Sequence, residues 1–163
     1  MKKLLDLREF EADYRDLIAG QLSLQLATSN NNGEAEISYA PFLQYRNAFY
    51  VYVSTLAKHT GNMLSSKQAS IMIIQPEAEA GNPFARKRLA FNCQVAEIGK
   101  DHESYSLVLD AMQSRLGEMV GLLRTLPDFH LLALEPQQGQ YIAGFGKAFN
   151  IDVDSGALSP VMG

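Results

Sequence analysis

Residues 82–92 read NPFARKRLAFN and set three cations side by side at the start of a β-type segment. Asn82-Pro83 ends the preceding element, because proline disfavours a helical residue before it and cannot donate a ladder hydrogen bond. The alternation that follows predicts a strand over residues 87–98. One face of that strand would carry Lys87, Leu89, Phe91, Cys93 and Val95, and the other Arg88, Ala90, Asn92 and Gln94.

The three adjacent cations, Arg86, Lys87 and Arg88, allow two interpretations. Arginine has a planar fork that grips a phosphate or carboxylate through two bonds, so the cluster indicates an anion-binding site. Charged side chains also protect exposed edge strands against aggregation. A solvated, charged edge strand is therefore the other interpretation.

The composition favours one globular domain, residues 1–163, with a sizeable core. The chain has 163 residues, 47% of them hydrophobic, and a net charge of −4. That charge argues against a nucleic-acid partner, because neutralising phosphates usually requires a basic face. Cys93 is the single cysteine, which excludes an internal disulfide and a thiolate metal cage. We expect a packed thiol there and assign no metal-ligating residue.

Several classes of protein are disfavoured by the motifs. The first residues, MKKLLDLREFEADY, interrupt a short apolar run with charges, so they predict neither a signal peptide nor a membrane span. The cytoplasm is the expected compartment. No GxSxG, Walker, HExxH or CxxC pattern occurs, which disfavours hydrolases and redox-motif proteins. We interpret the glycines of 144–146 (GFG) as backbone bends beside a cleft.

Hydrophobic periodicity predicts strands joined by tight turns and interrupted by a few helices. Helices are expected over 5–19, over 55–64, from an N-cap at Asp101 to near Gly117, and as a short helix or turn over 118–126; strands over 22–28, 35–39, 48–53, 69–75 and 87–98; and a final hairpin of 129–134 with 140–145 through a connector at 135–139. Runs of hairpins with few helices favour an antiparallel barrel with helices packed at its ends.

The order of four short motifs resembles the pyridoxamine-phosphate-oxidase-like, FMN-binding split barrels, and most of all their haem-utilisation branch, the HugZ/HutZ type. The motifs are LAKHTGN at 56–62, NPFARKRL at 82–89, PDFHL at 127–131 and GFGKAF at 144–149. They span roughly residues 10–155. The resemblance implies a mainly β, α+β fold: an antiparallel six-stranded split β-barrel with flanking helices. It also implies a homodimer with a small-molecule ligand in the intersubunit cleft.

The resemblance further implies a cofactor and site residues. In the haem-using branch, haem is degraded oxidatively with an electron donor and oxygen, and such a protein is an oxidoreductase. Arg88 would lie at the haem cleft, His59 near it, and Asp128 would accept the ring proton of an axial histidine from a neighbouring chain. The expected catalytic residues are thus Arg88 and Asp128, and the expected cofactor-binding residues are His59, Arg86, Lys87 and Arg88.

Two alternatives remain open at the level of sequence. In the flavin-using branch the ligand is FMN, and Arg86, Lys87 and Arg88 would neutralise its phosphate. The third reading is a non-catalytic split-barrel binding protein. The family's axial histidine lies in a C-terminal tail, and no histidine follows His130 in this sequence. We therefore expect this chain to bind haem weakly or through an abnormal axial ligand if it is a haem protein.

The aromatic residues of strand 48–53 predict a contact between chains. Phe49, Tyr50 and Tyr52 crowd a short strand, and alternation should leave one aromatic face outside the chain's own barrel. We expect this strand and the strand at 87–98 to help form the dimer interface.

Overall fold

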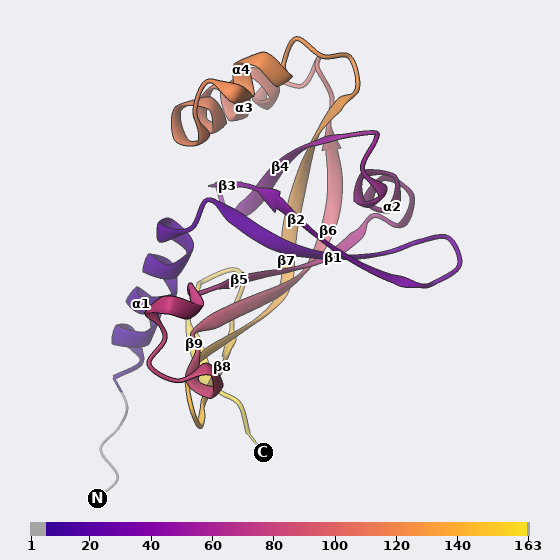
Figure 1. Cartoon of the computed structure of the whole chain (residues 1–163). Coiled ribbons are helices and arrows are strands. Elements are labelled where there is room, and N and C mark those ends of the chain that lie inside the picture. Colours follow the sequence, from indigo (N-terminus) through magenta and orange to yellow (C-terminus); the bar gives the residue numbers. More distant parts are fainter. Residues whose placement is uncertain (1–5, 163) are drawn as a thin grey trace, which may run out of the picture.

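A computed structural model describes residues 6–162 and shows one antiparallel nine-stranded sheet flanked by helices (Figure 1). Leu5, expected as the first apolar residue of the opening helix, lies outside the described residues. The helices are α1 Leu7–Gly20, α2 Lys58–Ser66, α3 Ser104–Leu116 and α4 Met119–Leu123, with 3-10 turns η1 Glu77–Glu79 and η2 Pro83–Ala85; the strands are β1 Ser23–Ser29, β2 Ala35–Pro41, β3 Leu43–Tyr45, β4 Ala48–Ser54, β5 Gln68–Ile74, β6 Arg88–Ile98, β7 Phe129–Gly144, β8 Lys147–Ile151 and β9 Leu158–Pro160.

The sheet follows the order β2-β1-β5-β6-β7-β4-β3, with β8 paired to β7 and β9 paired to β8. It curls so that β2 contacts β4 near its other edge. Figure 1 places α3 and α4 together at one end of the long strands β6 and β7, and α1 near the other end. The mainly β, α+β class is confirmed. Six strands were expected, and β1, β2, β4, β5, β6 and β7 correspond to them, whereas the short strands β3, β8 and β9 are additional.

The predicted final hairpin is wrong, because residues 129–144 form one continuous strand, β7. Its first half pairs with β4 and with the end of β6, and its second half pairs with the start of β6 and with β8. Pro136 and Gly139 suggested a turn, but a register shift at Asn92/Cys93 accommodates the proline. Gly139 is required for packing, since a Cβ there would lie 2.5 Å from the Phe91 ring. The hairpin instead turns at Phe145-Gly146, between β7 and β8.

The strand beginning at the NPFARKRL stretch has the predicted two faces. Leu89, Phe91, Cys93 and Val95 are buried, while Ala90, Asn92 and Gln94 are exposed. Burial raises the pKa of the Cys93 thiol to about 12, which confirms the expectation of a packed thiol. At α3 the expected cap differs: Asp101 precedes the helix by three residues, and the Nδ1 atom of His102 accepts from the Ser104 amide.

Two hydrophobic clusters stabilise the fold. The larger fills the barrel and includes Phe49, and the smaller lies between β4 and the α3–α4 pair. Tyr50 and Tyr52 pack against this smaller cluster. The aromatic face that suggested a subunit contact is therefore largely covered by the chain's own helices. Within residues 6–162, no helix has the length and apolar character needed to cross a membrane.

Candidate functional site

The three cations of residues 86–88 emerge from a tightly bonded corner between η2 and β6. The Asn82 side chain caps η2 by accepting from the Phe84 amide at 2.9 Å. Gln75, at the end of β5, then holds the next residues with three bonds. Its carbonyl accepts from Arg86 Nε at 2.6 Å, its side-chain oxygen accepts from the Lys87 amide at 3.2 Å, and its amide donates to the Lys87 carbonyl at 2.8 Å.

Lys87 differs from its two neighbours because its charge is compensated. Its Nζ lies 2.8 Å from Asp13 Oδ1 on α1, and the hydroxyl of the fully buried Tyr141 donates to Asp13 Oδ2. Partial burial opposes ionisation of Asp13, but the hydrogen bonds from Lys87 and Tyr141 and the Lys87 charge outweigh it, so the pKa of Asp13 is lowered. The same bond, together with burial, raises the pKa of Tyr141. This trio fastens α1 to the barrel.

Arg86 and Arg88 form no ion pair within residues 6–162. Arg86 donates to the Gln75 carbonyl, and Arg88 Nη1 donates to the Arg86 carbonyl at 2.8 Å. Both side chains are half-buried, and neither lies within ion-pair distance of a described carboxylate. Each guanidinium has five N–H donors, so most of its donors stay available for an anion. Among the three adjacent cations, Arg86 and Arg88 are thus the two without a described counter-charge.

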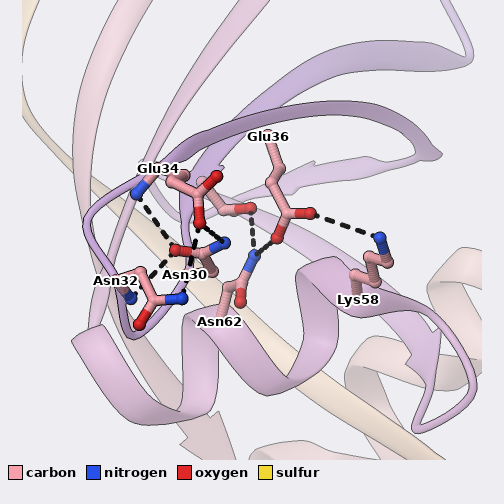
Figure 2. Close-up of polar contacts among 7 residues, drawn as sticks. Asn30, Asn32, Glu34, Glu36, Lys58 and Asn62 are labelled. Carbon is pink, nitrogen blue, oxygen red and sulfur yellow. Dashed lines mark hydrogen bonds and ion pairs between the residues drawn. The ribbon is translucent and has the colours of Figure 1, made fainter.

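His59 lies on α2, against the β1–β2 hairpin. Its Nδ1 is 2.8 Å from the Ser38 hydroxyl, and burial lowers the pKa of the imidazole. The helix itself is tied down beside it: Asn62 Nδ2 donates to Thr28 Oγ1 at 3.0 Å and to Glu36 Oε1 at 2.9 Å, as Figure 2 shows. Lys58 Nζ lies 3.6 Å from the other Glu36 oxygen. A neutral imidazole is thus held with its Nε2 atom free of described partners.

Asp128, just before β7, is held by the neighbouring end of β4. Ser54 Oγ donates to Asp128 Oδ2 at 2.6 Å, and the Asp128 carbonyl accepts from the Thr55 amide at 2.9 Å. The buried Thr60 hydroxyl donates to the Ser54 carbonyl at 2.6 Å. His59 and Asp128 are therefore linked through Thr60 and Ser54. Among the described residues Asp128 Oδ1 has no hydrogen-bond partner, so it can accept a proton from a bound group.

Within one chain the predicted site residues fall into two separate groups. Arg86, Lys87 and Arg88 lie at the start of β6, whereas Asp128 lies beyond its end, since Leu131 of β7 pairs with Ile98. The 11 residues of β6 at ~3.3 Å each separate the two ends by roughly 30 Å. His59 belongs to the second group, because Ser54 of β4 pairs with Phe129. One small ligand cannot contact both groups of a single chain.

Sequence reasoning missed the residues that hold these side chains in place. Ser38, Ser54, Thr60 and Asn62 each bond to a site residue or to its immediate support. Small polar residues are common on strands and short helices, and only the tertiary contacts distinguish these four. The Asp13–Tyr141 bond joins residues 128 positions apart, and no local pattern marks such a pair. His130 is outside the predicted site residues, and its Nδ1 lies 2.7 Å from Glu97 Oε2.

The fold and motifs place the chain in a known class of protein. A family model described as pyridoxamine 5'-phosphate oxidase matches residues 10–143, and the chain belongs to this family of split barrels. A curated relative, the haem oxygenase HutZ of Vibrio cholerae, is 38% identical over 144 residues, or 88% of this chain and 82% of the relative. Within the family, the chain therefore belongs to the haem-utilisation, HugZ/HutZ-type branch.

Two solved structures agree with this assignment. The crystal structure of HutZ from Vibrio cholerae, described as a haem storage protein, has a TM-score of 0.77 at 36% identity and covers 82% of this chain and 94% of its own. Campylobacter jejuni ChuZ has a TM-score of 0.87 at 28% identity, and the match covers 98% of this chain and 65% of that one.

Proposed function

We propose that this protein binds haem and takes part in its oxidative breakdown. The observation that carries the proposal is the pair of half-buried arginines, Arg86 and Arg88, whose charges no described carboxylate compensates. Haem carries two carboxylate arms, and a charge-assisted bond from arginine suits such a group. Similarity to a relative described as a haem oxygenase supports the same ligand.

We also propose that the site is completed by a second copy of the chain. Arg88 and Asp128 lie at opposite ends of β6, roughly 30 Å apart. In a homodimer the arginines of one chain can face Asp128 and His59 of its partner, so that one ligand contacts both groups. Exposed apolar residues suited to a subunit contact are Ile37 and Tyr39 on β2 and Met119 and Leu122 on α4.

The residues present fit a haem with its acidic arms on the arginines. Arg88 would bind one arm, and Arg86 beside it would bind the other or reinforce the first. Asp128, oriented by Ser54, has a free oxygen that can accept the ring proton of an imidazole supplied by the partner chain. Burial lowers the pKa of His59, and its Nε2, which has no described partner, can donate or accept a hydrogen bond according to the tautomer. When bound, haem supplies the iron at which oxygen reacts.

Two other functions use the same residues. FMN carries a phosphate that Arg86 and Arg88 could neutralise, and the description of the matching family favours this alternative. A protein that binds haem without turnover is the third function, and the description of one solved relative as a storage protein favours it. The three differ in spectrum and in the response to a reductant, so one set of measurements separates them.

The test is titration of the purified chain with haemin and, separately, with FMN. We expect haemin to give a saturable Soret band with one haem per chain or per dimer, and FMN fluorescence to stay unchanged. Adding ascorbate in air should then bleach the Soret band and release iron that a ferrous chelator detects. A stable Soret band under these conditions would assign a binding or storage role, and saturable FMN binding without haem binding would overturn the haem proposal.

Sedimentation of the same samples tests whether a second copy of the chain completes the site. We expect a dimer at micromolar concentration, with or without haem. A monomer that nevertheless binds haem with high affinity would show that one chain is sufficient and would contradict the shared site.

A further inference from the structure

Two phenylalanines beside the arginine pair stand almost entirely in solvent. Phe84 on η2 is 82% exposed, and Phe145 in the β7–β8 turn is 86% exposed. A scattered exposed apolar residue is ordinary on protein surfaces, but a local group of them marks a binding surface. These two rings are more exposed than any other aromatic side chain among the described residues.

The two rings flank the same corner of the fold. Arg88 pairs with Ile142 across β6 and β7, so η2, which precedes β6, and the β7–β8 turn, which follows β7, lie beyond the same end of this strand pair. The turn η2 also contacts β7. Phe84 and Phe145 therefore lie on loops at the same end of β6 and β7, and Arg86 and Arg88 follow Phe84 by two and four residues.

The loop that carries Phe84 is held by its own hydrogen bonds, and the turn that carries Phe145 is bounded by the paired residues Gly144 and Lys147. Asn82 caps η2 through the Phe84 amide, and Gln75 holds the residues that follow. Phe145 lies between Gly144 and Gly146, and Gly146 adopts a φ of 71°, a left-handed conformation that favours glycine. The backbone thus holds each ring outside the core, where the chain itself provides no cover.

We propose that Phe84 and Phe145 form an aromatic clamp for the planar conjugated ring of an acidic ligand whose anionic groups bind Arg86 and Arg88. This inference rests on the proposed function and deepens it, because it adds the residues that contact the ring to those that contact its acids. A flat π-system stacks on phenylalanine and leaves its charged arms free to reach the guanidinium groups. Haem and FMN share this chemistry, and a compact acid without a ring does not.

The test measures the affinity of the full chain for haemin and for FMN in the variants Phe84→Ala, Phe145→Ala and the double variant. Each single substitution should weaken binding of the ring-bearing ligand about threefold to tenfold, and the double substitution should weaken it more than either single one. Leu107→Ala on α3, an exposed apolar residue at the other end of β6 and β7, is the matched control and should change nothing.

Two further kinds of substitution separate ring stacking from general apolar contact with the ligand. Phe84→Tyr and Phe145→Tyr keep a ring and should keep the affinity, whereas Phe→Leu at either position should lose most of what alanine loses. Citrate, an acid without a ring, serves as a competitor for the arginines. Its inhibition constant should be equal in the wild type and in the double alanine variant.

The outcomes distinguish the clamp from the haem function. If the wild type binds haemin and the alanine variants bind it equally well, the clamp is wrong and the haem function stands. If the wild type binds FMN and not haemin, and the variants weaken FMN, the clamp stands and the haem proposal fails. A double variant that sediments as a monomer while the wild type is a dimer would make the rings a subunit contact and overturn the clamp. Failure of the wild type to bind either ligand overturns both proposals.

Discussion

The two ends of the barrel hold their polar residues in opposite ways. At the α1 end, a cation, an acid and a buried hydroxyl satisfy one another in the Lys87–Asp13–Tyr141 trio, and two arginines remain without a counter-charge. At the α3 end, hydroxyl groups hold an acid and an imidazole in place, as Ser54 does for Asp128 and Ser38 does for His59. The first end presents free positive charge, and the second presents proton acceptors.

The number of charged residues in a cluster therefore does not identify a binding group. A charged side chain is available to a ligand when no other group in the chain already compensates its charge. Three consecutive cations look equivalent in sequence, yet Lys87 is fastened to Asp13 and the arginines are not. An exposed ion pair contributes little to stability, but a half-buried arginine without a partner is available to a ligand. Substitutions at both ends of the barrel can test this contrast.

Arg88→Ala should weaken binding of the anionic ligand about tenfold to a hundredfold, because a charge-assisted bond to a partly buried anion is lost. Lys87→Ala should weaken it less than about threefold, since Asp13 already compensates that charge. Arg46→Ala, in the turn between β3 and β4, is the control. Haemin titration followed at the Soret band measures all three. Equal losses for Lys87 and Arg88 would show that the cluster acts as one unit.

Tyr141→Phe should lower the free energy of unfolding by about 1.5–3 kcal/mol, the usual range for a hydrogen bond to a charged group. The hydroxyl of the buried Tyr141 donates to the partly exposed Asp13 carboxylate, so its loss leaves the carboxylate with Lys87 alone. Urea unfolding followed by circular dichroism measures the change. Tyr39→Phe, an exposed tyrosine on β2, should be neutral. If Tyr141→Phe leaves the midpoint of urea unfolding unchanged, the packing of the Tyr141 ring holds α1 in place and the hydroxyl does not contribute.

Thr60→Val tests the α3 end and should cost about 1 kcal/mol of unfolding free energy, because the buried hydroxyl loses its bond to the Ser54 carbonyl. That carbonyl keeps a second donor, the Ala57 amide, which limits the effect. Thr60→Ser retains the hydroxyl and should retain most of the stability. If both variants lose the same stability, the methyl group of Thr60 is what matters. Urea unfolding of both variants decides.

Asp13→Asn should lower the free energy of unfolding at neutral pH by about 1 kcal/mol or less, because the Asp13–Lys87 pair is partly exposed. The substitution should also change how the free energy of unfolding depends on pH. The pKa of Asp13 is lowered on folding, so its ionised form stabilises the protein above about pH 4, and this contribution is lost as the pH falls through the folded value. The difference between the wild type and Asp13→Asn should therefore narrow on going from neutral pH to about pH 3.5. A difference that stays constant over this range would contradict the role of the Asp13 charge.

Much of the fold could be predicted from the sequence. Alternation gave β6 its buried and exposed faces, and Asn82-Pro83 marked the break before it. The periodic apolar residues of α1 and α3 were sufficient to place both helices within a few residues. The failure at 129–144 has a physical cause, since Pro136 and Gly139 favour a turn locally. Pairing with three neighbouring strands, β4, β6 and β8, and a register shift between β6 and β7 keep the segment extended.

The candidate site was less predictable. The motifs led to Arg86, Arg88, His59 and Asp128, and the structure gives each of them a defined setting. Their division into two groups roughly 30 Å apart follows from the register between β6 and β7. The homodimer, the single-domain organisation and the roles of these residues remain predictions.

The sequence by itself determined the family, the alternating faces of the long strands, and the presence of cations, an acid and an imidazole in motifs of known order. Those properties depend on residue type and short spacing, which a linear chain records directly. Tertiary packing determined that, among the described residues, Lys87 has an ion-pair partner and Arg86 and Arg88 do not, that Ser54 and Thr60 link Asp128 to His59, and that Phe84 and Phe145 are exposed to solvent. Partners of this kind come from segments distant in sequence, and burial and charge compensation exist only once those segments have packed together.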